Sequence, residues 1–583
     1  MRFPSFVTLA DRAREVGLRF PWTMMAGVVT AFAAIMGTTR SGSQEDMWVR
    51  VAAVSALGLA LTVALTLFAE ERRWSPVKKA VLNAAGVLGL VLFYLVWAGP
   101  EPKYEAVRYF QLSAGLHLLV ATLPFVGRPE TNAFWQYNRS LFLGFLRAYV
   151  FSFVLYVGLV IALVALDKLF GMHVPGQFYA RLYIVVVFVI NTGIFLAAVP
   201  RDLQQLAQDA SYPRVLQVFA QYILTPLVFT YLLILLAYLV KIVGGAQWPS
   251  GWIGWLVTSV AVAGLLGFLL VHPLRRDPRE AWIHTYTRWL FVGLIPAAVM
   301  LLVAFWKRIL PYGFTELRLL GVLLGFWLLA IAVSYTIRQE AGIRRIPVTL
   351  AALFLLTIYG PLSVTSWSVS SQGRRLARLV SAHNRGEPTD REASAALRFL
   401  LEHGARRQVM AAIPGSLPPV PWDSLTRRTA NQSEIATRIL RVAGMQYSAQ
   451  SGREGESYLY LYAREDPVLS VGGYEWILNV SSDNTTPIAA GTDTVRTRFD
   501  SSSDLVQVSV GRDSFRFDVG RLADTVWKDY STAPTNVPAE RLRLTTITPA
   551  HRAMLALQMV NGKRTADAVN VDRWHGKLFI GKP

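Results

Sequence analysis

The chain contains no cysteine among its 583 residues. This absence excludes disulfide bonds, cysteine-ligated zinc, iron–sulfur clusters and thiol catalysis together. Charged residues are also scarce, at 16% of the sequence, whereas soluble globular proteins carry about 25%. Hydrophobic residues make up 53% of the chain. The composition therefore indicates a protein that spends much of its length in lipid.

Sequence motifs of the common enzyme classes are absent as well. The eight histidines include no His-Glu-x-x-His arrangement, which is the zinc signature of many metalloproteases. No Gly-x-Ser-x-Gly elbow and no phosphate-binding P-loop occur either. We therefore expect no cofactor, no metal site and no recognised catalytic residue, and the sequence favours a protein that is not an enzyme without deciding the question.

The formal net charge of +20 raises the question of nucleic-acid binding. Most of the excess lies between long apolar runs, where the positive-inside rule and anionic headgroups account for it. No basic strip interleaved with aromatic residues accompanies it, as a nucleic-acid surface would require. We therefore expect the lipid bilayer, and not nucleic acid, to be the chief partner of these charges.

Apolar runs near the length of a bilayer crossing recur up to about Trp367. A helix needs about 20 apolar residues to cross the hydrocarbon core. We therefore expect about eleven transmembrane helices, at 21–37, 48–69, 80–98, 108–126, 141–166, 180–199, 216–242, 251–271, 284–304, 317–336 and 346–367. The first run follows several arginines and is similar to a signal peptide; we interpret it as an uncleaved anchor.

Lysine and arginine are distributed unequally between alternate loops. The richer set comprises the N-terminus and the loops with Arg72, Arg73, Lys78, Lys79, Arg128, Arg139, Arg201, Arg214, Arg275, Arg276, Arg279, Arg338, Arg344 and Arg345. The richer set is expected on the cytoplasmic side. An odd number of helices then places everything after Trp367 outside the cytoplasm, and we expect a bacterial inner-membrane protein.

The part after Trp367 has the charge density of a soluble domain. Residues 368–429 are expected to form a helical stalk that ends in a linker at Pro414–Pro421. From residue 430 the apolar period changes to two, which is typical of strands. The clearest example is a hairpin in which Val506–Val510 and Phe515–Val519 flank Gly511-Arg512-Asp513. We predict a membrane bundle at 1–367 and an extracytoplasmic β-rich α+β domain at 430–583.

Several stretches resemble a known family. They are Asn132–Arg139 leading into Leu159–Phe170, Tyr212–Trp252, Arg308–Arg318, Ser368–Leu379 and Gly473-Tyr474. Together they are similar to the bacterial membrane proteins catalogued as domain of unknown function 4153. The resemblance implies a multi-pass bacterial membrane protein with a C-terminal extracytoplasmic part. It implies no activity and supplies no catalytic residue.

The most specific of these stretches, Tyr312–Arg318, lies in a predicted external loop before a helix. Three interpretations remain open for Tyr312, Gly313, Thr315, Glu316 and Arg318. Thr315 and Glu316 suit the start of a capped helix. Alternatively, the segment forms a ligand or gating site, or Arg318 contacts a lipid phosphate when it does not pair with Glu316.

Two further candidates lie inside predicted spans. Arg147 is one third of the way into the fifth span and Asn191 is deep in the sixth. Ionisable and polar groups in the membrane are candidates for function, although Arg147 is also able to extend to the headgroups. Breaks at Pro226, Gly293 and Pro296 are expected to be helix kinks.

Three classes of function remain open on this sequence. The first is a non-enzymatic envelope protein whose exported domain binds a protein or lipid partner. The second is a transporter or channel for a small solute or lipid, which would need a polar, water-accessible cavity near Asn191 and Arg147. The third is a membrane enzyme acting on a lipid-linked substrate, which would need an acid–base cluster at one membrane face, for example at Glu316.

Overall fold

The computed structural model divides the chain into two compact units. It describes residues 6–39, 43–96, 104–128, 130–245, 252–276, 278–338, 342–413, 432–447, 457–464, 472–482, 487–490, 493–501, 503–529, 536–564 and 569–583. The first unit runs to Gln372 and includes Glu402–Ala405; the second comprises Gly373–Leu401 and the chain that follows Arg406, apart from a segment before Asn431. The predicted linker at Pro414–Pro421 lies outside the described residues.

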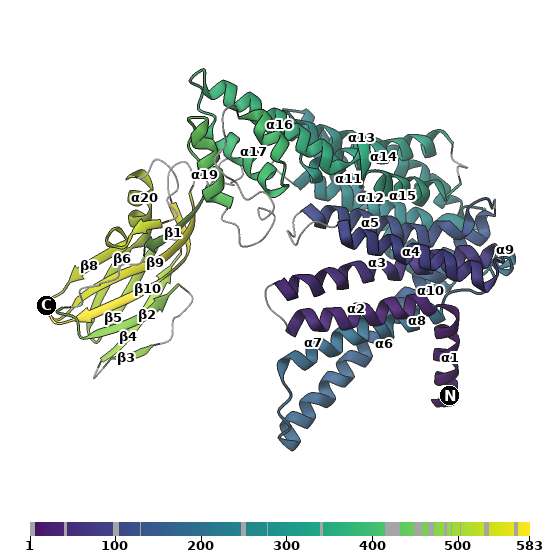
Figure 1. Ribbon diagram of the computed structural model, residues 1–583, viewed down its shortest axis with the longest axis horizontal. Coiled ribbons are helices and arrows are strands. Elements are labelled where there is room, and N and C mark those ends of the chain that lie inside the picture. The colour runs from purple at the N-terminus through teal and green to yellow at the C-terminus, as the bar shows by residue number, and fades with distance from the viewer. Residues whose placement is uncertain are drawn as a thin grey trace. The chain divides into compact units, whose positions relative to one another are not determined.

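The first unit is built from helices (Figure 1). Its N-terminal part contains α1 (Phe6–Arg19), α2 (Pro21–Thr39), α3 (Ser43–Glu71), α4 (Pro76–Val96), α5 (Tyr104–Thr122), α6 (Thr131–Phe170), α7 (Gly176–Val185), α8 (Thr192–Ala197) and α9 (Gln205–Gln208). Its later part contains α10 (Arg214–Val218), α11 (Thr225–Val243), α12 (Trp252–Val271), α13 (Ala281–Tyr312), α14 (Glu316–Ile337), α15 (Arg345–Leu356) and the first half of α16 (Val364–His383). Two π-helical turns interrupt long helices, η2 (Val186–Asn191) and η3 (Phe219–Leu224).

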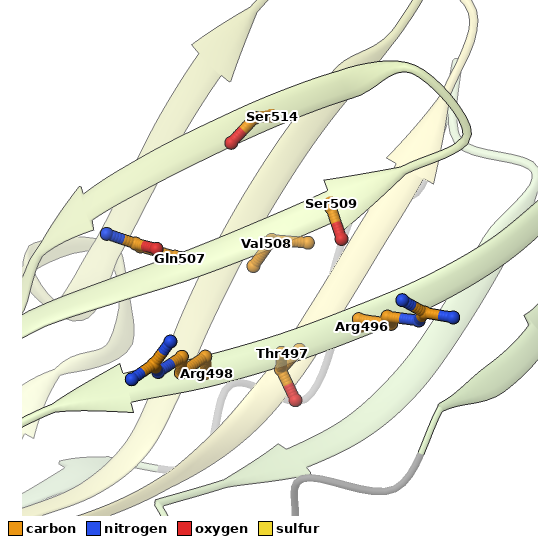
Figure 2. A pocket seen from close by; sticks show the side chains of 7 residues that line it. All are labelled: Arg496, Thr497, Arg498, Gln507, Val508, Ser509 and Ser514. Carbon is orange, nitrogen blue, oxygen red and sulfur yellow. The ribbon is translucent and has the colours of Figure 1, made fainter.

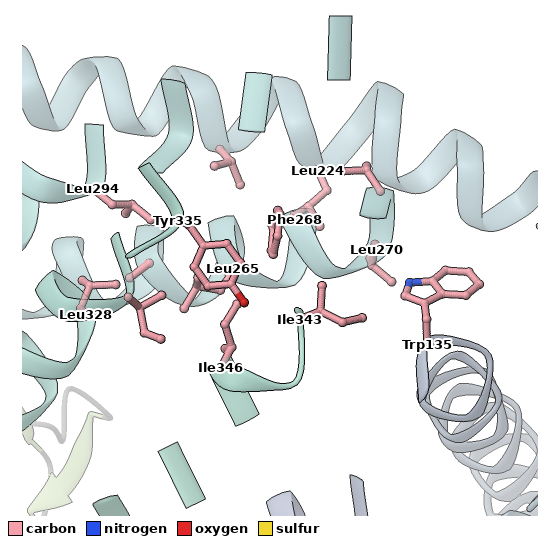
Figure 3. Close-up of a cluster of buried hydrophobic side chains, with 14 of the residues drawn as sticks. Trp135, Leu224, Leu265, Phe268, Leu270, Leu294, Leu328, Tyr335, Ile343 and Ile346 are labelled. Atoms are coloured by element: carbon pink, nitrogen blue, oxygen red, sulfur yellow. The ribbon is translucent and has the colours of Figure 1, made fainter. Parts of the chain in front are cut away.

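Aromatic packing holds the later helices of this unit together. The rings of Phe291 and Tyr335 stack with their centroids 4.7 Å apart, and Phe268 meets Phe291 edge-on at 4.9 Å. The Tyr335 hydroxyl donates a hydrogen bond to the carbonyl of Gly342, at 3.0 Å, so its polar end is satisfied. Figure 3 shows Phe268 and Tyr335 surrounded by leucine and isoleucine side chains of the same cluster.

Nine of the described helices are long and apolar enough to cross a membrane, not the eleven that we predicted. The predicted spans at 108–126 and 346–367 are the two that fail. The first corresponds to α5, which has 19 residues but carries Arg108, Gln111 and His117. The second shrinks to α15, whose 12 residues extend only about 18 Å at 1.5 Å per residue. The nine spans indicate a multi-pass membrane protein.

The helix α5 differs from the nine candidate spans in its polar composition. Near its start, the Arg108 guanidinium lies 5.4 Å from the Tyr359 ring centroid. The buried Gln111 amide then donates to the Thr357 hydroxyl, at 2.8 Å. Past the other end of α5, Arg128 pairs with Glu71 at the end of α3. Polar contacts therefore lie near both ends of α5 and along part of its length.

Several of the loops that we grouped by their excess of lysine and arginine contact one another at one end of the unit. Glu70 accepts from Arg19 at 2.9 Å and from Lys79 at 2.7 Å. Arg19 also donates to the carbonyls of Val199 and Pro200. A cavity of about 260 Å³ lies beside these groups, lined by Arg19, Leu67, Glu70, Glu71, Arg73, Pro200, Arg201, Asp202, Leu203 and Gln204. Charges from several loops are therefore neutralised together at this end.

The second unit begins with helices and continues as two β-sheets. Its helices are α17 (Asp390–Glu402), α18 (Arg406–Ala412), α19 (Gln432–Val442) and α20 (Val519–Asp529). Its strands are β1 (Ser457–Arg464), β2 (Trp476–Ser481), β3 (Ile488–Ala490), β4 (Asp493–Asp500), β5 (Leu505–Val510), β6 (Asp513–Asp518), β7 (Asn536–Pro538), β8 (Arg543–Ile547), β9 (Arg552–Arg564) and β10 (Val569–Gly581). One sheet has the order β2-β10-β9-β1-β7 with β8 beside β9, and the other has the order β3-β4-β5-β6. Only β1 and β7 are paired in parallel among these described strands.

The two sheets and α20 share one hydrophobic core. The inward positions include Val506, Val508 and Phe515 from the four-stranded sheet, and Leu555 and Leu578 from the other, all nearly inaccessible to solvent. The predicted hairpin is confirmed, because β5 and β6 are antiparallel with Val510 opposite Asp513. Its return strand ends at Asp518, however. We predicted that Val519 would be the last residue of this strand, but it is the first residue of α20.

One carboxylate links the turns of the two sheets. Asp513, at the start of β6, accepts hydrogen bonds from the Thr548 hydroxyl at 2.6 Å and from His551 Nδ1 at 2.9 Å. Thr548 and His551 flank the turn between β8 and β9. The hydrogen bonds from Thr548 and His551 lower the pKa of Asp513 below its ordinary value. The charged carboxylate is therefore the form that the fold stabilises.

This lowered pKa predicts a pH dependence for the second unit. The contribution of Asp513 is present above the unfolded-state pKa, about 3.9, and is lost as the pH falls through the lower folded-state value. We expect Asp513→Asn to destabilise the unit at pH 6 and to have little effect at pH 2. Hydrogen exchange of β5, β6 and β8, with the full chain in detergent, measures the urea midpoint of unfolding at each pH. As a control, Glu475→Gln should shift these midpoints little, because the Glu475 carboxylate pairs only loosely with Lys582. An equal loss of stability at both pH values for Asp513→Asn would contradict the link to its pKa.

Candidate functional site

The segment between α13 and α14 makes a sharp turn that requires glycine. Tyr312 is the last residue of α13, and the amide of Gly313 donates to the carbonyl of Ile309 at 2.8 Å. Gly313 has a φ of +68°, a region that residues with a β-carbon rarely adopt. The chain therefore leaves α13 abruptly and enters α14 within three residues.

Thr315 occupies the position before α14 but does not cap it with its side chain. Its backbone is extended, with φ −124° and ψ 163°, and its hydroxyl makes no cap hydrogen bond. Its carbonyl accepts from the amide of Leu319, at 2.9 Å. Thr315 therefore stands at the N-cap position, as the capped-helix interpretation expects, but its hydroxyl does not make the capping hydrogen bond. Glu316, the first residue of the helix, is buried and not exposed to water beside the helix dipole.

Glu316 is the centre of a buried polar group of three residues, which we call the Glu316 cluster. One carboxylate oxygen, Oε1, accepts from the hydroxyl of Thr365 on α16, at 2.5 Å. The other, Oε2, lies 3.6 Å from Nε2 of His403, which follows α17. The side chains of Glu316 and His403 are only 5% and 3% exposed. Three separate segments of the first unit therefore meet at one carboxylate.

Helix α16 also holds the backbone of the turn. The Gln372 amide donates to the carbonyls of Tyr312 and Phe314, at 2.9 and 2.8 Å, and the Phe314 amide donates to the Ser371 hydroxyl at 3.1 Å. Ser371 and Gln372 belong to the stretch Ser368–Leu379, which resembles the family independently of Tyr312–Arg318. Two family-like stretches thus bind each other through defined hydrogen bonds.

Arg318 closes the turn from the other side. Its guanidinium donates to the Gly313 carbonyl at 3.0 Å and lies 5.5 Å from the centroid of the Tyr312 ring. All five candidate residues of this segment lie at the turn. Among them, Glu316 is the one that belongs to the Glu316 cluster. We did not predict Thr365 or His403, because a threonine near a helix start and a single histidine carry no signal in one sequence.

Arg147 and Asn191, the two candidates within spans, make their hydrogen bonds on α6 and not at the turn. Arg147 is exposed, and its Nε donates to the Leu143 carbonyl one helical turn earlier, at 3.2 Å. Asn191 ends η2 and accepts from the Ser152 hydroxyl of α6, at 3.3 Å. Neither residue lines the 260 Å³ cavity at the charged end.

A metal centre finds no support in the described part of the chain. Among those residues, no group of three His, Asp or Glu side chains is placed to hold an ion. The Glu316 cluster has one carboxylate and one imidazole, which is fewer than the ligands of a structural or catalytic zinc site.

Comparison with known proteins identifies the family. The family described as "Domain of unknown function (DUF4153)" matches residues 25–393, which is more than half of the chain. The chain belongs to this family. The match includes the turn, Thr365 and α16, whereas His403 lies beyond it. The family-level description therefore covers two of the three members of the Glu316 cluster.

A relative and the solved structures add little on function. The protein named "Uncharacterized protein PM1469", from Pasteurella multocida (strain Pm70), is 24% identical over 270 residues. The match covers 45% of this chain and 45% of that protein, so the chain spans about half the length of this relative. No solved structure matches the chain significantly.

The geometry of the cluster predicts which substitutions disturb it. Glu316→Ala would leave the Thr365 hydroxyl without its acceptor in a buried site, an effect of about 1–3 kcal/mol. Glu316→Gln keeps an acceptor oxygen and should lower stability less. We expect this order in the thermal midpoint of the full chain in detergent, followed by tryptophan fluorescence. The neighbouring control Leu317→Ala, at a position 69% exposed, should change the midpoint least; equal midpoints for Glu316→Ala and Leu317→Ala would contradict a stabilising role.

Proposed function

We propose that this DUF4153 protein is a non-enzymatic protein of the bacterial inner membrane. Its helical unit anchors the chain, its N-terminus is cytoplasmic, and its C-terminal β region binds a partner outside the cytoplasm. The Glu316 cluster stabilises the outer end of the anchor, where the chain leaves the membrane spans for α16.

The observation that carries this proposal is the closed geometry of the Glu316 cluster. A catalytic acid or base must come within hydrogen-bond distance of the proton that it transfers. Both oxygens of Glu316 are instead directed at side chains of the same unit, Thr365 and His403, and almost none of its surface is exposed. This arrangement suits a buried link between helices better than an acid–base centre for a lipid-linked substrate.

The β region supports the second half of the proposal. It has its own hydrophobic core between two sheets, so it does not need apolar surface from the spans to be compact. The outward positions of β4, β5 and β6 are mostly polar and include several arginines. A compact body with a polar sheet face, carried by a membrane anchor, is well suited to binding.

The orientation is supported by the contacts among the basic loops. Arg19, Lys79, Arg128 and Arg201 neutralise acids at one end of the unit. This clustering supports the assignment of their loops to one side of the membrane. Lysine and arginine are enriched in cytoplasmic loops. The β region then follows on the opposite side, after an odd number of crossings.

The absence of cysteine makes this orientation directly testable. We expect Ser501→Cys, in the β region, to react with a membrane-impermeant maleimide when the outer face of the inner membrane is exposed in intact spheroplasts. Ser75→Cys, between α3 and α4, should react only after lysis. Both serines are exposed. Protection of Ser501→Cys until lysis would overturn the proposed location of the β region.

A transporter or channel is the second candidate, and the π-helical turns favour it. Such turns occur frequently at functional sites. The turn η2 brings the Phe188 carbonyl so close to Gly27 of α2 that a β-carbon there would lie 2.5 Å from it. The same turn ends at Asn191, which is half-buried and bound to Ser152. A polar pair beside an irregular helix is a feature that substrate pathways share.

Accessibility of Asn191 to water separates the two candidates. If the unit is only an anchor, we expect Asn191→Cys to be unreactive toward a charged methanethiosulfonate reagent in reconstituted protein, like the exposed apolar control Phe151→Cys. Ser501→Cys reports that the reagent is active. Rapid reaction at Asn191→Cys alone would reveal a water-filled path and favour transport over the anchoring proposal.

A further inference from the structure

The four-stranded sheet has one apolar and one polar face. Alternation along its strands directs Val495, Val506, Val508, Phe515 and Phe517 into the core. The opposite positions carry Arg496, Arg498, Gln507, Ser509, Ser514 and Arg516, and we call this surface the arginine face. Cross-strand pairing places Gln507 between Arg498 and Arg516, and Ser509 between Arg496 and Ser514. Three strands therefore present two adjacent rows of hydrogen-bonding groups.

The arginine face is hollowed. A cavity of about 460 Å³ opens on it, lined by Arg496, Thr497, Arg498, Gln507, Val508, Ser509 and Ser514. Figure 2 shows Arg496 and Arg498 on β4, opposite polar side chains of β5 and β6. The hollow is broad and open, so it suits groups at the surface of a larger body better than an enclosed small molecule.

The charges of this face are not neutralised within the described part of the chain. Arg496, Arg498 and Arg516 are all exposed, and none of them makes an ion pair with a described residue. Two carboxylates, Asp500 and Asp518, lie one row further along the same face. Each is already bound locally, Asp500 to the Ser503 hydroxyl at 2.8 Å and Asp518 to the Arg521 amide at 2.7 Å. The hollow itself is therefore positively charged.

The chemistry of the lining favours phosphate. Arginine presents a planar fork of donors that matches phosphate oxygens, and Ser514 and Gln507 add further donors. The six outward positions include no aromatic side chain on which a sugar ring or a base would stack. Arg496 and Arg498 are two residues apart on one strand, about 7 Å, so they suit separate neighbouring phosphates better than one shared group.

The covalent connection to membrane helices decides the source of this phosphate. A tethered domain meets the surface to which it is attached at a high effective concentration. Nine of the described helices are long and apolar enough to cross a membrane. We propose that the arginine face binds the phosphates of anionic phospholipids at the bilayer surface. This inference rests on the proposed function and names the partner of the β region as a lipid surface.

The magnitude follows from the charges. A basic residue near an anionic membrane surface contributes about fivefold in the docking equilibrium. Loss of all three arginines should therefore reduce docking on the order of 100-fold. High salt should also weaken docking of the arginine face to the membrane, because exposed charges are screened within a Debye length of about 3 Å at 1 M.

A single fluorophore on the full chain measures this docking. Thr494 is exposed on the same face and beside Arg496, and Thr494→Cys is a unique labelling site in a chain without cysteine. We expect an environment-sensitive dye there to shift in nanodiscs that contain phosphatidylglycerol and not in discs of phosphatidylcholine alone. The triple variant Arg496→Gln, Arg498→Gln, Arg516→Gln should abolish the shift. A matched triple on β10 and directly after its end, Arg573→Gln, Lys577→Gln, Lys582→Gln, should retain it.

Each other outcome overturns the inference in a recognisable way. An equal shift in both kinds of disc would show that the dye does not report phosphate recognition by charge. A shift with inorganic phosphate but not with phosphatidylglycerol would assign the face to a soluble ligand. No shift with either, or loss of the shift in the matched triple, would remove the lipid partner. Labelling of Ser501→Cys in spheroplasts tests the proposed function separately, so lipid binding can fail while the orientation holds.

Discussion

Lipid supplies no hydrogen bonds to a polypeptide backbone, and most of this chain is organised by that constraint. A crossing segment must satisfy its own amides and carbonyls, so it folds as a helix of about 20 apolar residues. Polar side chains are then confined to helix ends or must find partners inside the unit. The salt bridges of Glu70 and Glu71 occupy one such end. One such pair inside the unit is Gln111 with Thr357.

The Glu316 cluster follows the same rule at the start of a span. A buried carboxylate is costly unless other groups bind its oxygens. Thr365 and His403 fulfil this role, and they come from segments about 50 and about 90 residues later in the chain. Burial of this carboxylate therefore constrains the fold, because α16 and the segment after α17 must contact the start of α14. Gln372 adds a second link by binding the carbonyls of the turn.

The β region solves a different problem, because water is available on its outer faces. Its two sheets bury one face each, and the polar alternation along β4, β5 and β6 leaves the other face exposed. Where the sheets meet at their turns, Asp513 joins them through Thr548 and His551. An exposed face has no packing constraint on its side chains. Three arginines gather on this face without an ion-pair partner among the described residues, and two of them line the hollow. A ligand explains this arrangement better than stability does.

Periodicity in the sequence was sufficient for the features that depend on neighbours along the chain. Nine of the eleven spans predicted from apolar runs are found among the described helices. The period of two predicted the hairpin of β5 and β6, and Gly313 stands where the backbone needs a positive φ. Hydropathy averaged over a window failed at α5 and α15. An average over a window does not record that a polar residue such as Gln111 has a hydrogen-bond partner. It also does not record where a short helix such as α15 ends.

Only the tertiary structure decided which distant residues meet. No local pattern connects Glu316 to Thr365 and His403, because hydrogen bonds between segments depend on how the helices pack and not on sequence spacing. The arginine face is an intermediate case. Alternation alone places Arg496 and Arg498 on one side of a strand, but their register against Gln507 and Arg516 arises from strand pairing. The sequence by itself thus determined the membrane class and the local elements, whereas the Glu316 cluster and the arginine face were decided by contacts between elements.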